Sequence, residues 1–89
     1  FLILFTFLQA QNIAKAYSLI RKGKIDAAED HITQLNKNYP DNPAVLFLTA
    51  MIETEGEKAV DIYKKISNNY PNTESAKKAQ AELTTIHPV

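Results

Sequence analysis

The feature of this sequence that most limits how it folds is an internal repeat with a period of 31 positions. The stretch Lys37–Asn42 (KNYPDN) has a counterpart in Asn68–Thr73 (NNYPNT), and the two prolines lie 31 positions apart. Three pairs of residues upstream keep the same offset: Ala28 and Ala59, Ile32 and Tyr63, and Leu35 and Ile66. A repeat of this length is typical of arrays in which each unit buries its apolar face against its neighbour.

Within each unit the apolar residues follow the spacing of an α-helix. Ala28, Ile32 and Leu35 are separated by four and three positions, which places them on one helix face. The preceding segment has the same pattern in Ile13, Ala16, Tyr17 and Ile20. Gly23 lies between the two segments and can adopt the left-handed conformation that ends a helix. Since no long alternating apolar pattern is present, we expect no sheet.

The sequence therefore predicts an all-α fold built from helix pairs. We expect five helices, over Gln11–Arg21, Ile25–Asn38, Pro43–Thr54, Glu57–Asn69 and Thr73–Ile86. A Tyr-Pro step ends each unit, because proline cannot continue a helix and restricts the residue before it. The third helix is expected to be capped by Asp41 or Asn42, and the fifth by Asn72 or Thr73.

The first ten residues differ from the rest of the chain. Phe1–Leu8 (FLILFTFL) is a nearly unbroken apolar run, followed by Gln-Ala-Gln. A bilayer-spanning helix needs about 20 residues, so we expect no membrane span. The run resembles the apolar part of a secretory signal cleaved after Ala10, and the alternative is an N-terminal extension of the first helix. Residues 1–10 are therefore separated from a helical domain over residues 11–89, and a signal would make the protein exported rather than cytoplasmic.

Composition argues against several classes of function. The chain has 10 Lys plus Arg and 10 Asp plus Glu, and its scattered cations argue against nucleic acid as a partner. It has no cysteine, which excludes disulfides, thiolate metal sites and a cysteine nucleophile. With only two glycines the chain cannot form a glycine-rich phosphate loop.

No motif for catalysis or metal binding is present. The two histidines, His31 and His87, lie far apart without the spacing of metal ligands. Three glutamates around Gly56 lack the Asp/Asn ladder and the closing Glu of a calcium loop, and we interpret them as an acidic turn. We therefore expect neither an enzyme nor a bound metal or cofactor.

These patterns resemble the tetratricopeptide repeat family over about Asn12 to Ile86. The first unit matches its motif at Gly23, Ile25, Ala28, Ile32, Leu35 and Pro40. The second matches at Val45, Leu48, Ile52, Gly56, Ala59, Tyr63, Ile66 and Pro71. The second unit departs by a shorter turn, because Gly56 lies three positions before Ala59 whereas Gly23 lies five before Ala28.

The third unit consists of one predicted helix. Its apolar stripe is Ala76, Ala79, Leu83 and Ile86, and its outer side carries Lys77, Lys78, Gln80, Glu82 and Thr84. A polar outer face is typical of a capping helix at the end of an array. The alternative is that a second helix follows in a longer protein.

The resemblance implies a right-handed stack of antiparallel helix pairs, about two and a half repeats long, that binds a peptide or helix of a partner protein on its concave face. The first helix of each pair would line that face, with Ile13, Tyr17, Ile20, Arg21, Phe47 and Met51 as candidate binding residues. The alternative for Tyr17, Phe47 and Met51 is burial in the core. Exposed apolar residues near both ends could also support self-association.

A narrower resemblance concerns the location of the protein. The run Tyr70–Ala76 (YPNTESA) resembles bacterial cell-envelope members of the family, which agrees with the signal-like start. We therefore expect a scaffold in the periplasm or envelope. The alternative function is a non-catalytic structural segment of a larger enzyme or membrane complex.

Overall fold

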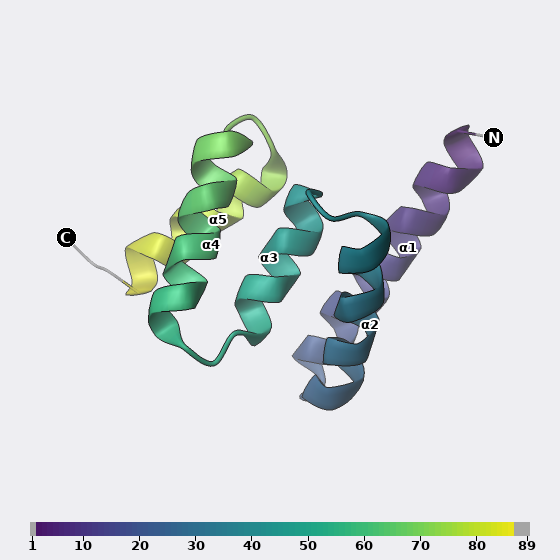
Figure 1. Cartoon of the computed structure of the whole chain (residues 1–89), viewed down its shortest axis with the longest axis horizontal. Coiled ribbons are helices and arrows are strands. Elements are labelled where there is room, and N and C mark those ends of the chain that lie inside the picture. Colours follow the sequence, from purple (N-terminus) through teal and green to yellow (C-terminus); the bar gives the residue numbers. More distant parts are fainter. Residues whose placement is uncertain (1, 87–89) are drawn as a thin grey trace.

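The computed structural model describes the backbone of residues 2–86 and the side chains of residues 10–85. It contains five helices: α1 (Leu2–Arg21), α2 (Ile25–Asn38), α3 (Pro43–Ile52), α4 (Gly56–Asn69) and α5 (Glu74–Ile86). Helix α2 packs on α1, α4 packs on α3, and α5 packs on both α4 and α3 (Figure 1). No strand occurs in the described residues. The predicted all-α fold of five helices is confirmed.

The helix boundaries of the two complete units coincide when the second unit is shifted by the 31-residue period. Their first helices end at Arg21 and Ile52, and their second helices begin at Ile25 and Gly56, which are the same repeat positions. The connecting turns, residues 22–24 and 53–55, are therefore equally long. The expected shorter turn in the second unit is wrong, because Gly56 is the first residue of α4 and does not correspond to Gly23.

The two turns reach the same length by different conformations. Gly23 has a φ of +79°, and it is the only residue with positive φ in the described part of the chain. The N–H of Lys24 donates to the carbonyl of Leu19, and that of Gly23 to Ile20, which is the Schellman arrangement. The second turn instead begins with extended backbone at Glu53. The predicted left-handed conformation of Gly23 is confirmed.

The ends of several helices differ from the predicted ones, whereas α2 agrees with its prediction. Helix α1 begins at Leu2 instead of Gln11, because no glycine or proline interrupts the chain before Arg21. Helix α3 stops at Ile52, two residues early, where Glu53 turns to extended backbone. Helix α4 begins at Gly56, one residue before the predicted Glu57.

At the start of α3 and at the start of α5, one of the two residues predicted as a cap forms the capping hydrogen bonds. The Oδ1 atom of Asn42 accepts hydrogen bonds from the N–H groups of Ala44 at 2.8 Å and Val45 at 3.3 Å. The Oγ1 atom of Thr73 accepts from the N–H of Ala76 at 3.1 Å. Thr73 therefore lies just outside α5 and not at its first position. Each cap satisfies N–H groups that the first turn of a helix leaves free.

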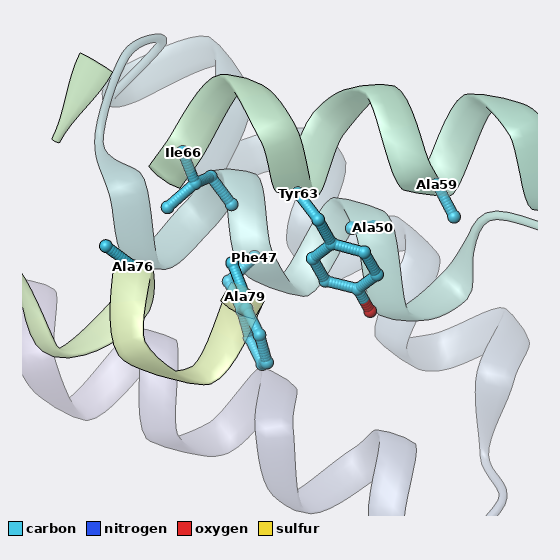
Figure 2. Packing of buried hydrophobic residues seen from close by; sticks show 7 residues of the cluster. All are labelled: Phe47, Ala50, Ala59, Tyr63, Ile66, Ala76 and Ala79. Carbon is cyan, nitrogen blue, oxygen red and sulfur yellow. The ribbon is translucent and has the colours of Figure 1, made fainter. Parts of the chain in front are cut away.

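The core consists of two apolar clusters, one for each interface along the stack. The first joins α1, α2 and α3 and contains Ala16, Ala28, Ile32, Leu35, Val45 and Leu48. The second joins α3, α4 and α5 and contains Phe47, Ala50, Ala59, Tyr63, Ile66, Ala76 and Ala79 (Figure 2). Met51 packs against both clusters, so the core runs without interruption along the stack.

The small residue at position 28 lets α1 and α2 approach closely. Ala28 has no exposed surface, and Ala59, its counterpart one repeat later, is 6% exposed. In the second unit the rings of Phe47 and Tyr63 lie 5.6 Å apart between centroids at an angle of 56°, a favourable tilted geometry (Figure 2). The repeated apolar pattern of the sequence is therefore the pattern of the core.

Polar contacts between neighbouring units also repeat at the same period. The side-chain amide of Asn36 on α2 donates to Thr49 on α3 at 3.0 Å. One repeat later, Gln80 on α5 donates to Ser67 on α4, also at 3.0 Å. The two bridges use the same pair of positions with donor and acceptor exchanged. They fix the same register between α2 and α3 as between α4 and α5.

In the described part of the chain, no helix combines the length and the apolar content needed to cross a bilayer.

Candidate functional site

The first helices of the three units form an open groove. Helix α3 is its floor, because it contacts both α1 and α5, whereas α1 and α5 do not approach each other closely. The groove has a volume of about 500 Å³, within the range of sites that hold small ligands or peptide side chains. Its lining is Ala10, Ile13, Ala14, Tyr17, Ala44, Phe47, Leu48, Ser75 and Lys78.

The groove is a product of the repeat. Ile13, Ala44 and Ser75 occupy one repeat position in three successive units, and all three line it. Ala44 on α3 and Ser75 on α5 have short side chains, which leaves open space above α3 between its walls, α1 and α5. Phe47 and Lys78 share another repeat position, whose counterpart in the first unit, Ala16, is fully buried.

Tyr17 is the largest half-buried side chain in the groove, and two cations lie beside its ring. The guanidinium carbon of Arg21 lies 5.8 Å from the ring centroid, and the Nζ atom of Lys78 lies 5.9 Å from it. Both distances are within the range of cation–π attraction. Lys78 was expected on the outer face of the last helix, and this expectation is wrong. Its position on α5 turns it toward α1, so that it lines the groove.

The structure separates the six candidate binding residues into three groups. Ile13, Tyr17 and Phe47 line the groove, although Phe47 is also a member of the core and only 8% exposed. Arg21 lies at its edge, against the ring of Tyr17. Ile20 and Met51 are half-buried and pack against the core.

Six residues of the lining were not among the candidates: Ala10, Ala14, Ala44, Leu48, Ser75 and Lys78. Most of them are small, and a search for large apolar or aromatic side chains does not select them. Moving 31 positions along the chain from Ile13 finds Ala44 and Ser75, and the same step from Phe47 finds Lys78.

The charge in the groove is of one sign. Its described lining contains a lysine and no carboxylate. The ion pair found among the described residues, Lys58 with Glu55 at 3.3 Å, joins two exposed side chains at the start of α4. Neither Arg21 nor Lys78 forms an ion pair with a described carboxylate.

The titratable groups outside the groove were compared with the arrangement that a metal ion requires. Among the described residues, no group of three or more His, Asp or Glu side chains is placed to hold a metal ion. The Nε2 atom of His31 is buried without a hydrogen-bond partner, and His87 lies outside the described residues. Burial raises the pKa of the Tyr63 phenol, and the nearby carboxylate of Glu82 raises it further. Tyr63 therefore stays neutral and contributes its ring to the core.

Comparison with known proteins agrees with this geometry. A family model described as tetratricopeptide repeat matches the chain twice, over residues 12–42 and 44–73. The first match covers most of α1 with α2, and the second covers α3 with α4. Neither the curated proteins nor the solved structures that were searched include a match.

Proposed function

This chain belongs to the tetratricopeptide repeat family, and from this premise we propose that it is a protein–protein interaction scaffold whose groove between α1, α3 and α5 binds a peptide or helix of a partner. Repeats of this family generally mediate protein–protein interaction, and they typically act without catalysis. The observation that carries the proposal is the groove itself, which is concave, mainly apolar and formed by the first helix of every unit.

The residues of the groove suit a protein ligand. Tyr17 offers a large, half-buried ring next to the aliphatic side chain of Ile13, while Phe47 forms part of the floor. Aromatic residues and arginine are enriched at the centres of protein interfaces, and Arg21 lies beside this ring. Ile20 and Met51 pack against the core formed by α1, α2 and α3. A ligand side chain would therefore enter a preformed site with little rearrangement.

We also propose that the scaffold acts in the bacterial cell envelope. The support for this is the apolar run of residues 1–8 followed by Gln-Ala-Gln, together with the YPNTESA segment. The test is mass spectrometry of the protein after cell fractionation. A form that begins at Gln11 in the envelope fraction supports export, and a cytoplasmic form that retains the apolar run contradicts it.

The groove is tested with two matched substitutions. Ala14 and Ala27 are both exposed helical alanines, but Ala14 lines the groove and Ala27 lies on α2, away from it. Ala14→Trp places a neutral, bulky side chain in the groove, whereas Ala27→Trp makes the same change elsewhere. Affinity capture from an envelope extract should lose a specific partner with Ala14→Trp and keep it with Ala27→Trp. A partner that both variants retain equally would assign binding to another surface, and capture of no specific partner would favour a structural role.

A further inference from the structure

Building on the proposed function, we propose that the ligand of the groove is an acidic peptide segment, in which a large apolar side chain lies next to one or more carboxylates. The apolar side chain would occupy the space above Ala44 and Leu48. The carboxylates would face Lys78 and Arg21, which both lie beside the Tyr17 ring.

The first support is the charge of the groove. Lys78 lines it and Arg21 lies at its edge, both within 6 Å of the Tyr17 ring centroid. Neither forms an ion pair with a described carboxylate, although the chain has as many acidic as basic residues. Complementary charge selects partners and steers their approach more than it adds affinity. An acidic ligand is therefore favoured over a neutral one, and a basic ligand is disfavoured.

The second support is the way in which the chain distributes its acidic residues. Helices α1 and α3, a wall and the floor of the groove, contain no Asp or Glu, whereas α1 carries Lys15 and Arg21. The second helices carry five of the ten acidic residues, namely Asp26, Glu29, Asp30, Glu57 and Asp61. The chain is neutral as a whole, but the groove side of its first two units is not. Helix α5, the other wall, carries Glu74 and Glu82 as well as Lys77 and Lys78, but of these four only Lys78 lines the groove. The charge that lines the groove is therefore positive.

The third support is the mixed character of the lining. Apart from Lys78, Ser75 and the hydroxyl of Tyr17, the side chains that line the groove are apolar. A purely acidic segment would leave that apolar surface without a partner, and a purely apolar one would bury Lys78 without a counter-charge. A segment that combines both kinds of residue satisfies both halves of the groove.

The test begins with a selection in which the probe is a displayed library of random peptides. The groove variant is Arg21→Gln with Lys78→Gln. Its control is Lys22→Gln with Lys77→Gln, which removes two exposed cations at the adjacent positions and leaves the same net charge. Circular dichroism confirms that both variants keep the helical content of the parent protein.

Peptides retained by the parent protein should be enriched in Glu or Asp beside a large apolar residue. The best of these peptides, compared with its Glu→Gln form by fluorescence anisotropy, should bind more tightly, and added salt should reduce this preference. The groove variant should bind the acidic peptide about five- to tenfold more weakly than the parent, since each exposed charge pair contributes modestly. The control variant should stay within about twofold, because its changes lie outside the groove.

Four outcomes would overturn the inference. Selection of neutral or basic peptides, or equal loss in the two double variants, would show that the cations do not choose the ligand, while the groove would remain a binding site. Selection of no peptide would exclude a short acidic segment as the ligand. Sedimentation of the parent as a dimer that the groove variant abolishes would show that a second copy of the chain occupies the groove.

Discussion

Replacing each glycine by alanine should change the stability of this protein in opposite directions. Gly23 has a φ of +79° at the end of α1, whereas Gly56 is the first residue of α4 and does not have a positive φ. Apart from the adjacent backbone and the two neighbouring residues, a Cβ atom added at either position would meet no atom within 4 Å. Since neither substitution creates a clash or a contact, the difference between them isolates the cost of the backbone conformation.

The magnitude follows from two terms. Alanine restricts the unfolded chain more than glycine does, which stabilises the folded state by about 0.4–1 kcal/mol wherever the native conformation allows alanine. Gly56→Ala should gain this amount. At Gly23 the left-handed conformation costs a residue with a Cβ about 1–2 kcal/mol, which exceeds the gain. The free energy of unfolding of the two variants should therefore differ by about 1–2 kcal/mol, with Gly23→Ala the less stable.

Thermal and urea unfolding followed by circular dichroism measure this difference. For a domain of this size, each kcal/mol corresponds to about 4–8 °C in Tm. Gly23→Asn is the control, because asparagine tolerates the left-handed region and should lose less stability than alanine. If Gly23→Ala were as stable as Gly56→Ala, the reasoning from the Schellman turn would be refuted.

Three further substitutions test the packing, the capping and the titration of the fold. Ala28→Leu should lower the free energy of unfolding by about 1–3 kcal/mol, because the fully buried side chain lies where α1 and α2 pack closely. Its control, Ala27→Leu on the exposed face of α2, should change the free energy of unfolding little. Equal urea midpoints for the two variants would contradict the packing model. Asn42→Ala should cost about 1 kcal/mol in thermal unfolding through loss of the α3 cap, and Asn72→Ala, which removes no side-chain hydrogen bond, should not. The raised pKa of Tyr63 means that folding favours its neutral form, so stability is fully present below the ordinary tyrosine pKa of 10.0 and falls as pH rises above it. Tyr63→Phe should lessen that alkaline loss in urea titrations, and an unchanged pH profile would exclude Tyr63 as its source.

The fold could be predicted from the sequence because one pattern determines several levels of structure. The positions that repeat at Ala28 and Ala59 are the closely packed ones, and the Tyr-Pro steps end the second helices where they were expected. Two details could not be obtained in this way. Residue type alone matches Gly56 with Gly23, whereas the helix boundaries put Thr54 at the repeat position of Gly23. The start of α1 could not be predicted, because an apolar run such as residues 1–8 occurs both in secretory signals and in helices.

The candidate site was only partly predictable, because residue type and groove geometry select different side chains. Large apolar side chains are good binding candidates, but their size and hydrophobicity also favour burial in the core, as Met51 shows. A groove needs small residues along its floor and walls, which leave space without contributing an obvious motif. Ala44 on the floor and Ser75 on a wall are of this kind. Their common feature is the repeat position that they share with Ile13. In a repeat protein the surface that a residue faces is therefore better predicted from its position in the unit than from its chemistry, and Lys78 is the clearest case. Its charge suggested an outer face, whereas its repeat position, shared with Phe47, places it in the groove.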